Sequence, residues 1–145
     1  MTAKEYLLKI QTYRKSMIRT ERTIEEMYAA LGIRGISYDK DRVQSSPDNA
    51  LESGFVRIDE QKRKLEDQAL KYAEAVRVRI DRLSTLSNPA HAEVLSLRYI
   101  DLERDGRLKT FAKIGKKMGY SEKQARRLHG HALEAFRKKY HFHKR

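Results

Sequence analysis

The sequence has no cysteine and only two prolines among its 145 residues. Without cysteine the chain forms no disulfide and offers no cysteinyl zinc site or thiol nucleophile, which is compatible with a reducing cytoplasm. No apolar run approaches the ~20 residues that a membrane-spanning helix needs, and the first residues lack the apolar core of a signal peptide. We therefore expect a cytoplasmic protein that does not enter a membrane. Because prolines and glycines are few, long helices are permitted.

Positive charge is in excess, and it is unevenly distributed. The net charge is +12 at pH 7. Residues 1–89 hold 17 Lys and Arg against 14 Asp and Glu, whereas residues 90–145 hold 15 against 6. The C-terminal segment therefore carries +9 of the total, which is the electrostatic footprint of a polyanion-binding region.

Residues 1–88 are predicted to form an antiparallel, coiled-coil-like helical hairpin. Thr2 and Glu5 form a capping box at the start of the first helix, and Gly32 and Gly35 end it. Its apolar positions recur every three or four residues: Tyr6, Ile10, Tyr13, Met17, Thr20, Ile24, Met27 and Leu31. The second helix carries a similar seam: Phe55, Ile58, Lys62, Leu65, Ala69, Tyr72, Val76, Ile80 and Leu83. Residues 32–54 read as an irregular loop of unassigned role.

Residues 89–145 are predicted to form a helix-turn-helix domain with a basic tail. A first helix starts at Asn88-Pro89, with Asn as its cap. A polar turn around Gly106 follows, and residues 110–137 read as two helices joined by a turn at Gly119. The positions expected to face inward are Ala112, Ile114, Met118, Ala125, Leu128, Ala132 and Phe136. The fold class is therefore all-α: a hairpin followed by three short helices.

The opposite face of the last helix is cationic. Its first residues, after the Ser121 cap, include Lys123, Arg126 and Arg127. N-terminal residues of a recognition helix meet base edges in the major groove, where Arg and Lys pair with guanine. Cations on the preceding helix are better placed for phosphates.

Several of these residues resemble region 4 of sigma factors, which recognises the promoter −35 element. The resemblance rests on Leu97-Arg98-Tyr99, Thr110-Phe111, Ile114-Gly115, Met118-Gly119 and the run from Ala125 to Arg137. It implies DNA base contacts at Glu122, Lys123, Arg126 and Arg127. Phosphate contacts are expected at Thr110, Lys113, Lys116, Lys117 and Gln124. Nothing in the chain resembles sigma region 2, which melts promoters.

The whole layout is similar to phage-encoded regulators of the ArpU/RinA type, through the run Leu128-His129-Gly130-His131-Ala132-Leu133 and, more weakly, residues 41–46. This resemblance implies an activator of phage late genes that works with the RNA polymerase of a Gram-positive host. Double-stranded DNA is the expected partner, with host polymerase and a second copy of the chain, joined through the N-terminal helices, as candidate partners.

Two other classes of function fit the sequence less well. A terminase small subunit also joins a helix-turn-helix to long helices, but usually places it first. An adaptor that binds polymerase without reading DNA conflicts with the +9 C-terminal segment. We find no acid–base pair, nucleophile or metal constellation, so neither an enzyme nor a cofactor is expected. His129 and His131 lie two residues apart on a helix and cannot chelate one ion together.

Overall fold

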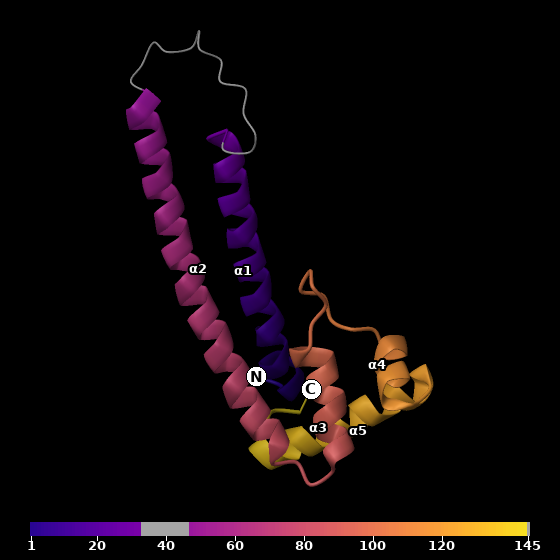
Figure 1. Cartoon of the computed structure of the whole chain (residues 1–145). Coiled ribbons are helices and arrows are strands. Elements are labelled where there is room, and N and C mark those ends of the chain that lie inside the picture. The colour runs from indigo at the N-terminus through magenta and orange to yellow at the C-terminus, as the bar shows by residue number, and fades with distance from the viewer. Residues whose placement is uncertain (33–46, 145) are drawn as a thin grey trace. The chain divides into compact units, whose positions relative to one another are not determined.

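A computed structural model of the chain describes residues 1–32 and 47–144, and this part is helical. The elements in chain order are α1 (Ala3–Ala30), α2 (Pro47–Ser84), α3 (Pro89–Leu95), the π-helical segment η2 (Ser96–Ile100), α4 (Phe111–Met118) and α5 (Glu122–Tyr140) (Figure 1). The predicted all-α class is confirmed, with a contacting pair of long helices followed by a small three-helix domain. Within the described ranges, no helix has the length and apolar character needed to cross a bilayer.

The described residues group into two compact units. The first combines Met1–Lys15 with Lys71–Arg145, and the second is Ser16–Leu70. The beginning of α1 and the end of α2 therefore group with the C-terminal helices. The domain boundary expected after residue 88 stays a prediction.

The start and the apolar seam of α1 follow the sequence pattern. The Glu5 carboxylate accepts from the Thr2 amide at 2.7 Å, and the Glu5 amide donates to the Thr2 hydroxyl at 3.1 Å, so the predicted capping box is present. Thr20 is the one polar member of the seam, and its hydroxyl donates to the Ser16 carbonyl at 3.1 Å. The buried seam positions are Ile10, Met17, Thr20 and Ile24.

The second helix starts earlier than the sequence pattern indicated. Residues 47–54 were assigned to the connecting loop, but they form the first turns of α2. A proline at the first helical position has a preset φ and no backbone donor to leave unpaired, so Pro47 is a favourable start. Gly54 lies within this helix, where a Cβ would come 2.5 Å from a methyl carbon of Leu31. The rest of the predicted loop, residues 33–46, lies outside the described residues.

The seam of α2 also differs from the predicted one. Phe55 and Ile80 were placed in the seam, yet they are 44% and 46% exposed. Ile58 and Leu83 are buried as expected, and Arg79 is buried in the place expected for Ile80. The Arg79 guanidinium is satisfied there, since it donates to the carbonyls of Tyr6 at 2.9 Å and Ala75 at 3.1 Å. It also lies 4.1 Å from the centroid of the Tyr6 ring, an additional favourable contact.

One apolar core joins the chain's first helix to its last. Its buried members are Ala3, Leu7, Leu83, Leu86, Val94, Leu95, Tyr99, Ile114, Ala125, Ala132 and Phe136. The Tyr6 ring lies 5.1 Å from Phe142 and 6.1 Å from Phe136, so aromatic rings from both ends of the chain meet. In the predicted basic tail, Phe142 packs on this core, and the His143 amide donates to the Met1 carbonyl at 3.3 Å.

Candidate nucleic-acid interface

The first helix of the helix-turn-helix begins and ends at the predicted residues, whereas α5 continues beyond Arg137 to Tyr140. The Thr110 hydroxyl accepts from the Lys113 amide at 3.3 Å, which caps α4. Gly119 ends α4 in the left-handed region at φ 77°, a conformation that glycine adopts without strain. One inward assignment on α4 is corrected: Ala112 is exposed, while Ile114 and Gly115 are buried. At 100° per residue, Ala112 lies nearly opposite the buried Ile114, whereas Phe111 lies one turn before Ile114 on the same side and packs against the core.

Glu122–Tyr140 presents its charged side outward because the opposite side is fully buried. Ala125, Ala132 and Phe136 have no exposed surface. At 100° per residue, Lys123 and Arg127 lie on the side opposite these three residues. Both cations are exposed, and within the described ranges neither makes an ion pair. They are therefore free to contact a polyanion.

The two other predicted base-contacting residues, Glu122 and Arg126, form an ion pair with each other. A guanidinium nitrogen of Arg126 lies 2.9 Å from a carboxylate oxygen of Glu122, one helical turn away. The same guanidinium lies 5.2 Å from the centroid of the Phe111 ring. Both side chains are exposed, so the ion pair contributes little stability and can exchange with a DNA group. Their contact with bases stays a prediction.

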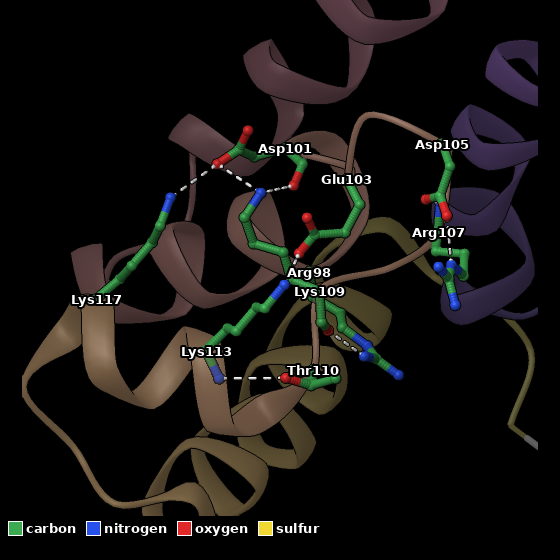
Figure 2. Close-up of polar contacts among 9 residues, drawn as sticks. All are labelled: Arg98, Asp101, Glu103, Asp105, Arg107, Lys109, Thr110, Lys113 and Lys117. Carbon is green, nitrogen blue, oxygen red and sulfur yellow. Dashed lines mark hydrogen bonds and ion pairs between the residues drawn. The ribbon is translucent and has the colours of Figure 1, made fainter. Parts of the chain in front are cut away.

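The predicted phosphate-contacting cations of α4 differ in their surroundings (Figure 2). The Lys113 ammonium lies 3.0 Å from a Glu103 carboxylate oxygen, and the Lys117 ammonium lies 3.6 Å from one of Asp101. Lys116 is exposed and has no ion pair in the part of the chain that the structure describes. Lys116 is therefore the α4 cation most available to a phosphate.

The segment before α4 is held by one buried cation, Lys109, and one partly buried cation, Arg98 (Figure 2). The Lys109 ammonium donates to the Asp101 carbonyl and lies 3.1 Å from the Asp101 carboxylate. Arg98 donates to the Lys109 carbonyl, and its guanidinium lies 4.4 Å from the centroid of the Phe111 ring. The Gln11 amide donates to the Gly106 carbonyl at 3.0 Å. Lys109 and Arg98 therefore position α4, and neither is a free contact for DNA.

Gln124 forms a capping box with Ser121 at the start of α5. Its side-chain oxygen accepts from the Ser121 amide at 2.9 Å, and its own amide donates to the Ser121 hydroxyl at 3.1 Å. This capping box fixes the first turn of the helix. The oxygen is thus occupied, and the NH₂ group is left for a partner.

A partly buried histidine, His129, lies on the recognition helix α5. His129 and the Tyr99 hydroxyl form a hydrogen bond of 2.8 Å, and the His129 ring lies edge-on to Phe111 with 5.0 Å between the ring centroids. Burial lowers the pKa of His129 to about 4, and the positive charge of Arg98 adds to this shift. Burial likewise raises the pKa of Tyr99 to about 12. His129 is therefore a neutral packing residue, whereas His131 is exposed on another side of the helix.

We expect the free energy of unfolding to fall as the pH is lowered from 7 to 5. An unfolded histidine binds a proton near pH 6.5, while folded His129 does so only near 4. In that window the unfolded state binds more protons, so acid favours unfolding, by at most about 1.4 kcal/mol per pH unit. Urea denaturation of the wild type and of His129→Gln at both pH values measures this. An equal pH dependence in the two proteins would exclude His129 as the cause.

Sequence periodicity did not identify two groups of residues around this interface. The first comprises Asp101 and Glu103, which pair with the α4 lysines across a turn. The second comprises Asn88, His91 and Tyr120, which lie beside Gln124 and Arg127. Isolated acidic residues in a strongly basic segment were the available signal for the first group. The second group had none, because its members come together only through the packing of α3 on α5.

This geometry, a capped helix, a glycine turn and a cationic second helix with a buried inner face, defines a helix-turn-helix. Residues 83–138 match the family model of sigma-70, region 4. The chain thus carries a sigma-70 region 4-like domain, which implies a DNA-binding helix-turn-helix used in transcription. The match covers fewer than half of the residues. No curated protein and no solved structure gave a significant match to the chain.

Proposed function

We propose that the chain is a sequence-specific DNA-binding regulator of transcription, without enzymatic activity, that activates phage late genes with host RNA polymerase. This proposal rests on Lys123 and Arg127, which are exposed on the recognition helix of a sigma-70 region 4-like domain and make no ion pair with any described residue. The phage and late-gene part rests on the resemblance of the chain's layout to ArpU/RinA-type regulators. Such a regulator acts where the DNA and polymerase are, in the bacterial cytoplasm.

Self-association through the N-terminal helices is part of the same proposal. Three large apolar side chains of α2 are exposed in the second unit: Phe55, Val56 and Leu70. Exposed apolar surface of this kind favours contact with another chain. A two-fold dimer would require two inverted half-sites in the DNA.

Arg127→Ala and Lys116→Ala test the division between base and phosphate contact. Arg127→Ala should cost about 1–3 kcal/mol on the cognate site and little on random DNA, because a bidentate base contact is lost. Lys116→Ala should weaken both DNAs and lower the salt slope by about 1, because one counterion fewer is released. Both side chains are exposed and unpaired within the described ranges, so neither change should unfold the protein. The measurement is fluorescence anisotropy over a range of salt concentrations.

The cognate site comes from selection of a random DNA pool by the full-length protein. Equal losses of affinity on both DNAs for Arg127→Ala would contradict a base contact by Arg127. Failure to enrich any site would contradict sequence-specific binding. A selected site without inverted symmetry would argue against the dimer. Transcription by host polymerase from a promoter carrying the site should rise when the protein is added, and a fall would exclude activation.

A further inference from the structure

A groove of about 370 Å³ lies between the start of α3 and the first half of α5, and we call it the α3–α5 groove. It is continuous with the candidate interface, because Gln124 and Arg127 form part of its wall. Its lining residues are Asn88, His91, Tyr120, Gln124, Arg127, Leu128 and His131. None of the functional assignments made from the sequence included Asn88, His91, Tyr120 or His131.

Hydrogen-bond donors dominate the lining of this groove. The amide oxygen of Asn88 accepts from the Ala90 amide at 3.0 Å, and that of Gln124 accepts from the Ser121 amide at 2.9 Å. Both oxygens are used in helix caps, so the NH₂ ends remain to donate. Four further polar side chains of the lining have no hydrogen bond or ion pair within residues 1–32 and 47–144: His91, Tyr120, Arg127 and His131.

Among the residues that the structure describes, no carboxylate lines the α3–α5 groove. A second groove, beside α4, contrasts with it: that groove contains Arg104, Arg107 and Lys113, but also Glu103 and Asp105. There the carboxylates already pair with cations, since Arg107 lies 2.5 Å from Asp105 and Lys113 lies 3.0 Å from Glu103. Of these two grooves, the α3–α5 groove is the one whose described lining has no carboxylate to compete with a bound anion.

The occupant must present several acceptor oxygens next to the recognition helix. A DNA backbone phosphate has these oxygens, and strands of phosphates flank the major groove, which is about 12 Å wide. About half to two-thirds of protein–DNA hydrogen bonds go to phosphate and sugar oxygens, many from Asn, Gln and Tyr side chains. The lysines of α4 and the α3–α5 groove lie on different elements, which suits contact with two places on the DNA backbone.

We propose that the α3–α5 groove holds a backbone phosphate of the bound DNA, with His91 and Tyr120 among its donors. This inference rests on the proposed DNA-binding function. Arg127, which is shared by the groove and the outward side of α5, would then lie between the held phosphate and the base edges. The held phosphate would fix the register of the recognition helix on its site.

A scan with single methylphosphonate substitutions tests the proposal. Each substitution replaces one charged phosphate oxygen of the selected site by a methyl group, and binding is measured with the full-length protein. At one position the wild type should bind about 3- to 10-fold more weakly, as expected for the loss of one or two hydrogen bonds. His91→Ala and Tyr120→Phe should each bind the unmodified site more weakly, and should lose sensitivity at that same position.

Tyr72→Phe serves as the matched control, because Tyr72 lies on α2 and does not line the groove. It should keep the wild-type sensitivity at every position. Thermal unfolding is recorded for each variant, and Tyr120→Phe removes only an exposed hydroxyl, so a folded variant is available even if His91→Ala is destabilised.

The outcomes separate this inference from the function on which it rests. If the wild type enriches no DNA site, the proposed function fails. If it binds a site but both variants keep the full methylphosphonate profile, DNA binding stands and the groove proposal is overturned. A change in base preference without loss of phosphate sensitivity would mean that the groove reads a base, which also overturns it.

Discussion

Replacing Leu7 by alanine is expected to destabilise the C-terminal helix-turn-helix by about 2–5 kcal/mol. Leu7 is fully buried and belongs to the same apolar cluster as Tyr99, Ile114 and Phe136. It lies on α1, far upstream of residues 83–138, which match sigma-70 region 4. The alanine would leave a cavity between α1 and the helices that present the candidate interface. Because small domains are stable by only about 5–15 kcal/mol, such a loss is a large fraction of the total.

Urea denaturation followed by circular dichroism measures this effect, with Lys9→Ala as the control. Lys9 is exposed on the same helix, so its replacement should leave the midpoint almost unchanged. A fragment that starts at residue 83 should also lose cooperative unfolding, because it lacks Ala3 and Leu7. A fragment that unfolds cooperatively and binds the selected site like the full chain would show that α1 is dispensable for this core.

The second large effect is expected at Gly115, where alanine should destabilise the protein by about 1–3 kcal/mol or more. A Cβ at this position would lie 2.6 Å from the Tyr120 carbonyl oxygen and 2.9 Å from that of Ser121. Both neighbours are backbone atoms, so no side-chain rotation can relieve the contact. The Tyr120 amide also donates to the Gly115 carbonyl at 2.7 Å, which holds the turn close to α4. Alanine would therefore move the turn and, with it, the start of the recognition helix.

Gly130→Ala is the matched control, and it should change stability in the opposite direction. Gly130 lies inside α5, and a Cβ there would meet no atom within 4 Å. Glycine in a helix interior costs about 0.5–1 kcal/mol relative to alanine, so this replacement should raise the midpoint. Thermal unfolding of the two variants gives the signs. A rise in the midpoint for both variants would mean that the Tyr120 backbone accommodates the extra carbon.

Helix ends were predictable because local chemistry decides them. Asn88, Thr110, Ser121 and Gly119 cap or end their helices as expected, each through contacts within a few residues. The start of α2 was missed because its loop-like composition masked the one helix-starting signal, Pro47. The burial of Arg79 was missed because its acceptor, the Tyr6 carbonyl, lies 73 positions away in the sequence.

In the candidate interface, too, the features decided by local sequence were predictable and those decided by tertiary packing were not. The apolar stripe through Ala125, Ala132 and Phe136 fixed which side of α5 faces outward, so Lys123 and Arg127 were identified. Periodicity gives the direction of a side chain but not its partner. The pairing of Lys113 with Glu103 depends on the path of the turn before α4. The α3–α5 groove depends on tertiary packing between residues 88 and 131, which no local pattern reports.

The joining of both chain ends in one core affects how the protein is made. Ala3 and Leu7 leave the ribosome well before Phe136 and Phe142, which complete their core. At about 5–20 residues per second, α1 must wait on the order of ten seconds for these partners. A nascent chain that stops before Phe136 cannot complete this core. Premature termination would therefore release no truncated chain with a complete DNA-binding domain that could compete with the full protein for DNA.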